Sequence, residues 1–169
     1  AEEALKAGNA DLIVAGGMES MTNAPYLLKK HRSGARIGHD TAYDHMFLDG
    51  LEDAYEPGRA MGTFAQETAN EYQLTREDQD NYSIGSLRRA QEAISSGAFV
   101  SEIVPVTVVS RAGETVVDTD EQPGKGRPDK IPSLKPAFAK DGTITAATSS
   151  SISDGAAALV LSRASTAAA

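Results

Sequence analysis

The chain of 169 residues contains no cysteine, which excludes disulfide bonds and metal sites with thiolate ligands. Its only histidines, His31, His39 and His45, do not form a zinc-binding pattern, so we expect no metal centre. No apolar run approaches the ~18 residues that a membrane-spanning helix needs, and no signal peptide is recognisable. These absences favour a soluble, cytoplasmic globular protein without a membrane partner.

Basic residues are also scarce, with 16 Lys and Arg against 24 Asp and Glu and a formal net charge of −8. Because nucleic-acid backbones require a basic surface, we expect no nucleic-acid partner. Charge is unevenly spread, since residues 20–39 contain no acid and residues 40–56 contain no lysine or arginine. A second basic cluster, at 125–135, lies among glycine and proline. Such runs usually form solvated surface, but either basic run could also bind a small polyanion.

The N-terminal part of the sequence has the order of helix and strand that is typical of an α/β protein. Residues 1–7 predict a helix that stops at Gly8-Asn9, and the apolar run 11–15 predicts a buried strand. Gly16-Gly17 would let the backbone turn after that strand. A helix followed at once by a buried strand is typical of α/β folds. The stretch 22–60 is too irregular for a regular sheet, and loops of this length are usually functional or disordered.

Helical periodicity dominates the middle of the chain. Residues 61–72 predict a helix, and a longer helix over 76–96 is favoured by a near capping box at its start and by Gly97 at its end. In the first helix one face is formed by Phe64, Ala65, Thr68, Ala69 and Tyr72. The β-branched runs 104–109 and 114–118 predict a hairpin.

The remaining sequence alternates loop and apolar segments. We expect a loop over 123–136, a strand or the start of one over 144–147, and a buried strand or helix over 156–161. The intervening small hydroxyl residues are Thr148, Ser149, Ser150, Ser151 and Ser153. Such residues allow a ligand to approach the backbone closely, although an ordinary polar turn before a core strand is the simpler interpretation of the residues alone.

Two stretches carry a family resemblance. Residues 15–21 read Ala-Gly-Gly-Met-Glu-Ser-Met, and residues 143–159 read Thr-Ile-Thr-Ala-Ala-Thr-Ser-Ser-Ser-Ile-Ser-Asp-Gly-Ala-Ala-Ala-Leu. Both resemble the biosynthetic-type thiolases of the acetyl-CoA acetyltransferase kind, which use two cysteines to make or break a carbon–carbon bond between acyl-CoA units. The resemblance covers nearly the whole chain and implies an internal fragment that begins after the nucleophilic cysteine.

The resemblance implies an α/β, thiolase-like layered fold, present here as a partial N-terminal half with an inserted loop domain. Residues 1–21 would belong to the N-terminal core, residues 22–141 to a loop domain for CoA binding and oligomer contacts, and residues 142–169 to the core again. The basic run 29–36 would lie in the loop that forms a dimer or tetramer. An incomplete sheet should expose apolar strand surface, so the fragment should be poorly soluble or associate.

The resemblance also implies a substrate and a site. The substrate is a coenzyme A thioester, no separate cofactor is implied, and the reaction joins two acetyl-CoA into acetoacetyl-CoA plus CoA or reverses it. Ser150 and Ala146 would line the pantetheine tunnel, and a basic cluster would receive the nucleotide end. The candidate CoA-binding residues are Ser150, Ala146, Met61, Phe138, Leu51, Lys125, Arg127 and Lys130. The apolar members of this set are equally suited to core packing.

Two departures from the family pattern bear on this site. Many relatives have Asn-Ala-Ser where this chain has Thr148-Ser149-Ser150, so bracing by the asparagine side chain must be replaced or lost. Acetyl-specific relatives often carry histidine before the methionine, whereas Ala60 precedes Met61 here. A smaller side chain near the acyl end could admit a longer acyl chain than acetyl.

The catalytic groups of the family are absent. Its mechanism needs a cysteine thiolate that becomes acylated, a histidine in a Gly-His-Pro setting that activates it, and a second cysteine that removes a proton. The chain has none of these and no Gly-x-Ser-x-Gly elbow for a serine nucleophile. We therefore expect no catalytic residue in this chain, which alone should be inactive.

Three functions remain open from the sequence. The chain is part of an acetyl-CoA C-acyltransferase, with the remainder of that thiolase as its partner, or an inactive CoA-binding or assembly module, or part of a condensing relative such as a ketoacyl synthase. Residues 75–80 and the run 16–21 fit a thiolase better than a synthase, so we favour the first.

Overall fold

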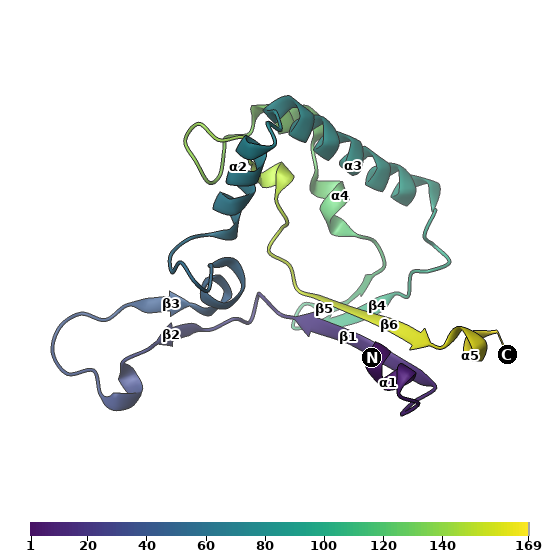
Figure 1. Cartoon of the computed structure of the whole chain (residues 1–169). Helices are drawn as coiled ribbons and strands as arrows, with labels where there is room; N and C mark the ends of the chain where they lie inside the picture. The colour runs from purple at the N-terminus through teal and green to yellow at the C-terminus, as the bar shows by residue number, and fades with distance from the viewer. Residues whose placement is uncertain (169) are drawn as a thin grey trace. The chain divides into compact units, whose positions relative to one another are not determined.

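The computed structural model describes residues 1–168, which divide into two compact units. The first unit contains residues 1–59 and the segment from Ser151 onward, and the second contains residues 60–150. Figure 1 shows the course of the chain through its elements. Within the described residues, no helix combines the length and apolar character required to cross a membrane.

The first unit is built around two antiparallel strand pairs. Its elements are α1 (Glu2–Lys6), β1 (Leu12–Glu19), β2 (Tyr26–Leu28), η1 (His31–Ser33), β3 (Ala42–Asp44), η2 (Phe47–Leu51), β6 (Gly155–Ser162) and α5 (Ala164–Ala167). Strand β1 pairs with β6, so that Leu12 lies opposite Ser162 and Glu19 opposite Gly155. Strand β2 pairs with β3. The irregular stretch 22–60 thus contains one short strand pair that its scattered glycines and prolines did not predict.

Strand β1 confirms the expected strand but continues through Gly16-Gly17, where a turn was predicted wrongly. The reason is the close approach of the partner strand, because an ideal Cβ at Gly16 would lie 2.9 Å from Ala158 Cα. Glycine at this position therefore lets β1 run alongside β6. The segment 156–161 forms a strand as one of its two predicted alternatives.

The β1–β6 pair is exposed rather than buried, contrary to the sequence-based expectation for each strand. Val14 is 66% exposed and its cross-strand partner Val160 is 70% exposed. Within the described residues, β1 and β6 pair only with each other, so no further strand extends this pair. Exposed apolar strand surface is what an incomplete sheet was expected to show.

Three long-range hydrogen bonds connect the ends of this strand pair to other parts of the chain. Arg163 donates to the Leu5 carbonyl at 3.0 Å and to the carboxylate of Asp11, which ties the end of β6 to α1 and the start of β1. At the other end, Asp154 accepts a hydrogen bond of 2.9 Å from the backbone N–H of Thr22. This bond lowers the pKa of Asp154 below its ordinary value because it stabilises the charged carboxylate.

The second unit is mainly helical. Its elements are α2 (Met61–Glu71), α3 (Arg76–Ser96), β4 (Val106–Ser110), β5 (Gly113–Val117), α4 (Glu121–Lys125), η3 (Pro128–Ser133) and η4 (Ala146–Thr148). The Thr75 hydroxyl accepts from the N–H of Asp78 at 3.1 Å, and Gly97 adopts a left-handed conformation with φ of 70°. Both predicted ends of α3 are confirmed, as is the antiparallel β4–β5 hairpin.

Helix α2 forms where predicted, but only Ala69 of the five residues assigned to one face is buried. Its buried residues are Gln66 and Ala69, while Tyr72 is 70% exposed and Ala65 and Thr68 are also exposed. The burial of Gln66 was not expected from the sequence, because the glutamine is stabilised by partners from a distant segment, which periodicity does not register.

Two further expectations in this unit need correction. The predicted loop over 123–136 contains α4 and η3, because Asp120 caps α4 by accepting from the N–H of Gln122 at 3.0 Å and Pro128 suits the start of η3. The strand or strand start predicted over 144–147 is not formed, because the short 3₁₀ helix η4 begins at Ala146 and residues 144–145 precede it without regular structure. Its preceding backbone N–H groups donate to side chains rather than to a neighbouring strand.

Candidate functional site

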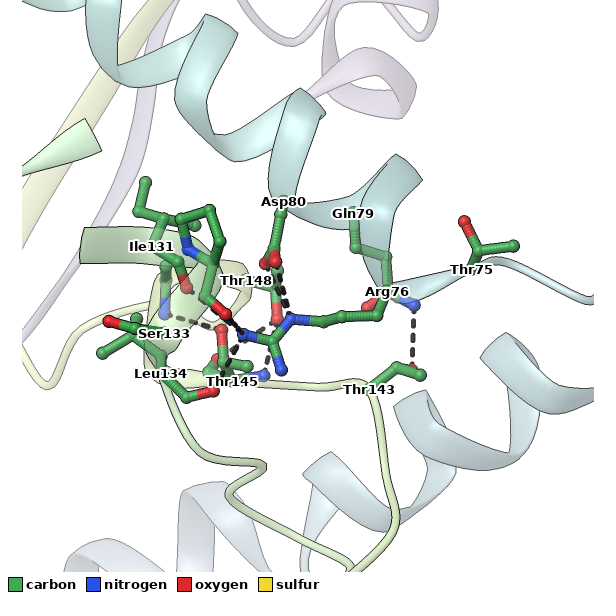
Figure 2. Close-up of polar contacts among 12 residues, drawn as sticks. Thr75, Arg76, Gln79, Asp80, Ile131, Ser133, Leu134, Thr143, Thr145 and Thr148 are labelled. Carbon is green, nitrogen blue, oxygen red and sulfur yellow. Dashed lines mark hydrogen bonds and ion pairs between the residues drawn. The ribbon is translucent and has the colours of Figure 1, made fainter. Parts of the chain in front are cut away.

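The best-defined polar cluster lies between the first turn of α3 and the segment 131–149 (Figure 2). Arg76 donates through Nε to both carboxylate oxygens of Asp80, at 2.9 and 2.8 Å. Helical spacing of four residues places these side chains on one face, and Asp80 is buried. Arg76 Nη2 donates to the carbonyls of Leu134, Ile131 and Pro132 at 2.8, 3.2 and 3.3 Å. One guanidinium thus joins α3 to the end of η3.

A second contact point of the same segment is Thr143. Gln66 Oε1 accepts from the N–H groups of Thr143 and Ile144 at 2.8 and 3.2 Å. Gln79 Nε2, from α3, donates to the Thr143 hydroxyl at 2.9 Å and to the Leu74 carbonyl at 3.0 Å. Helices α2 and α3 therefore both hold the chain just before η4.

The turn that follows is braced by its own hydroxyl groups. Thr145 is 0% exposed, and its hydroxyl accepts from the N–H of Ala147 at 3.2 Å. Thr148 Oγ1 accepts from the N–H of Thr145 at 2.8 Å and donates to the Thr145 carbonyl at 3.2 Å. Ser149 Oγ donates to the same carbonyl at 2.8 Å. At the position where the resembling family has asparagine, Thr148 therefore fixes the backbone.

Ala146 and Ser150 flank this braced turn. Ala146 is the first residue of η4, and Ser150 follows it after Ser149; both are exposed. Hydrogen bonds of Thr145 and Thr148 fix the backbone of the turn. The exposed Ser150 hydroxyl is therefore attached to a backbone of defined geometry. The structure thus places the two candidate pantetheine residues on a single ordered turn.

The apolar candidates fall into two groups. Met61 begins α2, and the exposed ring of Phe138 packs against the next residue, Gly62, so closely that a Cβ there would overlap the ring. Met61 and Phe138 are therefore brought to the same end of α2. Leu51 ends η2 in the first unit, whereas all the other candidate residues belong to the second.

The basic candidates occupy one short helical segment. Lys125 ends α4, Arg127 precedes η3 and Lys130 lies within it. Lys125 Nζ contacts Glu121 Oε2 at 2.5 Å, and this hydrogen bond lowers the pKa of the Glu121 carboxyl. Lys130 Nζ lies 4.0 Å from Asp129 Oδ2. All three cations are exposed, so an anionic ligand would compete with these carboxylates.

Helix α3 anchors this basic segment as well. Gln91 Nε2 donates to the Pro123 carbonyl at 2.8 Å. The side chain of Leu87 packs against Gly126, where a Cβ would lie 2.6 Å from Leu87 Cδ1. Pro123 is buried. The segment that was expected to be a loop is thus fixed on α3 at one end by Gln91 and at the other by Arg76.

Sequence reasoning missed the residues that do this fixing. The spacing of Arg76 and Asp80 on one helix was a usable signal for an ion pair, and Thr145 and Thr148 have the spacing of a capping box. Nothing local in the sequence indicated that Gln66 would accept from a segment so distant along the chain.

An open cavity of about 490 Å³ lies beside these residues and is lined by Ala65, Thr68, Ala69, Leu74, Ile144 and Thr148, among others.

Comparison with known proteins identifies the family. The family model described as "Thiolase, N-terminal domain" matches residues 1–165. The chain is 50% identical to an acetyl-CoA acetyltransferase of Escherichia coli over 163 residues, covering 95% of this chain and 41% of that protein. It is 46% identical to an acetyl-CoA acetyltransferase of Saccharomyces cerevisiae over 162 residues, covering 94% and 40%.

The fold agrees with this match. The solved structure of an acetyl-CoA acetyltransferase from Syntrophomonas wolfei superimposes with a TM-score of 0.84 and 38% sequence identity, over 95% of this chain and 41% of that one. The expected α/β, thiolase-like fold is therefore confirmed. The chain spans about two fifths of the length of these relatives. With residues 1–165 matched by its N-terminal domain, the chain belongs to the thiolase family.

Proposed function

We propose that this chain is the acyl-CoA-binding part of an acetyl-CoA C-acyltransferase. The whole enzyme transfers an acyl group between CoA thioesters through a cysteine acyl-enzyme, in the direction of acetoacetyl-CoA or in the thiolytic reverse. The names of the E. coli and yeast relatives support this activity. The observation that carries the proposal is the turn at 145–150, whose backbone is fixed by Thr145 and Thr148.

Each candidate residue of the second unit has a role that its chemistry allows. Ser150 provides a hydroxyl for a pantetheine amide, and Ala146 leaves room for the pantetheine chain. Lys125, Arg127 and Lys130 provide donors for the phosphates of the nucleotide end. Met61 and Phe138 provide apolar contact for the acyl and pantetheine groups. The acyl-CoA is the substrate, and no further cofactor is proposed.

The chain supplies binding but no catalytic group. It has no cysteine to carry the acyl group, so the nucleophile must come from the remainder of the thiolase. The proposed setting is a cytoplasmic homo-oligomer, a dimer or a tetramer. Acetyl is the proposed acyl group, although Ala60 in place of the histidine of acetyl-specific relatives leaves space for a longer chain.

Calorimetric titration of this chain with CoA and with dephospho-CoA tests the proposal. The basic candidates are neutralised together in the variant Lys125→Gln, Arg127→Gln and Lys130→Gln. This variant should bind CoA less tightly by a larger factor than dephospho-CoA, because only CoA carries the 3′-phosphate. The matched control is Lys6→Gln, Arg88→Gln and Arg89→Gln, which removes the same total charge elsewhere. Equal losses for both ligands would refute the 3′-phosphate assignment, and no binding of either ligand would refute the CoA site.

The second candidate function is a CoA-binding or assembly module without activity. The absence of cysteine from the chain favours it. A thiolysis assay with acetoacetyl-CoA and CoA, run on this chain alone, should give no turnover under either proposal. Turnover restored by adding the remaining part of a thiolase would favour the acyltransferase, whereas CoA binding with no restored turnover would favour the module.

A further inference from the structure

We infer that Arg76 and Gln66 are positioning residues that hold the CoA-binding segment 131–150 in its binding geometry. The inference rests on the proposed function and assigns to α2 and α3 a role beyond the candidate contact residues. Neither side chain belongs to the candidate binding set. Both reach backbone groups of the segment that carries Phe138, Ala146 and Ser150.

The two anchors lie on either side of Phe138. Arg76 fixes the chain before it, through the carbonyls of Ile131 and Leu134, and Gln66 fixes the chain after it, through the N–H groups of Thr143 and Ile144. The braced turn with Ala146 and Ser150 follows the second anchor directly. A shift at either anchor would therefore be transmitted to the residues proposed to contact the ligand.

Arginine is required at the first anchor for a geometric reason. The Ile131 carbonyl also accepts from the N–H of Leu134 at the end of η3, and Arg76 Nη2 adds a donor to this carbonyl and to those of Pro132 and Leu134. Meanwhile Nε of the same planar group binds Asp80, which keeps the side chain in one orientation. A lysine could keep the charge beside Asp80, but it has no second, rigidly placed nitrogen to reach the carbonyls.

This difference separates positioning from simple stabilisation. If Arg76 only neutralises the buried carboxylate of Asp80, Arg76→Lys should behave like the unmutated chain in every respect. If it positions the segment, Arg76→Lys should leave the helices folded but release the backbone at 131–134. Hydrogen exchange of backbone amides reports such local release directly.

The test measures CoA affinity by calorimetry and amide exchange over 131–150 for Arg76→Lys, with Arg88→Lys as the matched control on an exposed turn of α3. We expect Arg76→Lys to weaken CoA binding about tenfold, as a displaced binding group does, and to speed amide exchange over residues 131–134, with unchanged helical circular dichroism. Arg88→Lys should change neither quantity. Gln66→Met, which removes the acceptor at the second anchor, should reproduce the loss of CoA affinity with Arg76 intact.

The possible results distinguish failure of the positioning role from failure of the proposed CoA-binding function. Full CoA affinity in both Arg76→Lys and Gln66→Met would overturn the positioning role, whether or not exchange becomes faster. Unchanged exchange over 131–150 in both variants would overturn it equally, because the segment would then not depend on these anchors. Absence of CoA binding by the unmutated chain would instead refute the proposed function itself.

Discussion

Thr148 illustrates how much a single hydroxyl determines in this molecule. Its Oγ1 accepts from the N–H of Thr145 and donates to the Thr145 carbonyl, and Thr145 has no exposed surface. A valine has nearly the same shape but can make neither bond, which would leave a buried N–H unsatisfied. Thr148→Val should therefore lower the free energy of unfolding by about 1–3 kcal/mol, measured by urea denaturation.

The conservative control for that change is Thr148→Ser, which keeps the hydroxyl. It should retain most of the stability that Thr148→Val loses, since only a methyl group is removed. Equal stability of the two variants would show that the hydroxyl does not brace the turn. The same comparison tests whether Thr148 replaces the asparagine of the resembling family as a backbone brace.

At the scale of elements, glycine at two adjacent positions of β1 has two different roles. A Cβ at Gly16 would overlap the Ala157 carbonyl of β6 and lie 2.9 Å from Ala158 Cα, whereas a Cβ at Gly17 would have nothing within 4 Å. Gly16→Ala should therefore push the strands apart and cost about 1–3 kcal/mol of unfolding free energy. Gly17→Ala should be neutral or slightly stabilising, because glycine weakens a strand.

Thermal unfolding of the two variants, followed by circular dichroism, measures this difference. A similar melting temperature for Gly16→Ala and Gly17→Ala would contradict the close approach of β1 and β6. The pairing itself was not foreseeable, because the two strands are separated by nearly the whole chain. The sequence predicted a turn at the glycine pair, and only the partner strand explains why the extended conformation continues.

Elements with strong local signals were predictable from the sequence. Thr75 and Gly97 mark the ends of α3 through a side-chain cap and a left-handed glycine, both of which act within a few residues. The segment 144–147 was predicted wrongly as a strand because its apolar and β-branched residues carry a strand signal. In the structure, the distant Gln66 takes the backbone donors of Thr143 and Ile144 that a neighbouring strand would need.

The candidate site likewise contains residues that the sequence could indicate and residues that depend on distant partners. The contact residues Ser150 and Met61 came from a family resemblance. The supporting residues Gln66 and Arg76 were missed because their partners lie far along the chain, at backbone atoms that any sequence would provide. The short-range part of the support, the pair Arg76 and Asp80, could have been recognised from its helical spacing.

At the scale of the whole molecule, apolar burial is sparse. The buried hydrophobic residues among those described are Leu5, Ala69, Ile131 and Ile144, while many large apolar side chains are exposed. Contiguous exposed apolar surface favours association in water. The net charge of −8 opposes it by repulsion between copies. Self-association of this chain should therefore become stronger when salt screens that repulsion.

The exposed pair of Val14 and Val160 allows this prediction to be tested. They are cross-strand partners in β1 and β6, so their side chains lie on the same face of the strand pair. Sedimentation velocity should show association that grows with protein and salt concentration, and Val14→Thr with Val160→Thr should weaken it while keeping β-branched residues in the strands. Ile37→Thr, at a fully exposed residue outside any strand, should leave it unchanged. The strand surface would not drive association if the chain stayed monomeric at every protein and salt concentration. The same would follow if the double variant associated as strongly as the unmutated chain.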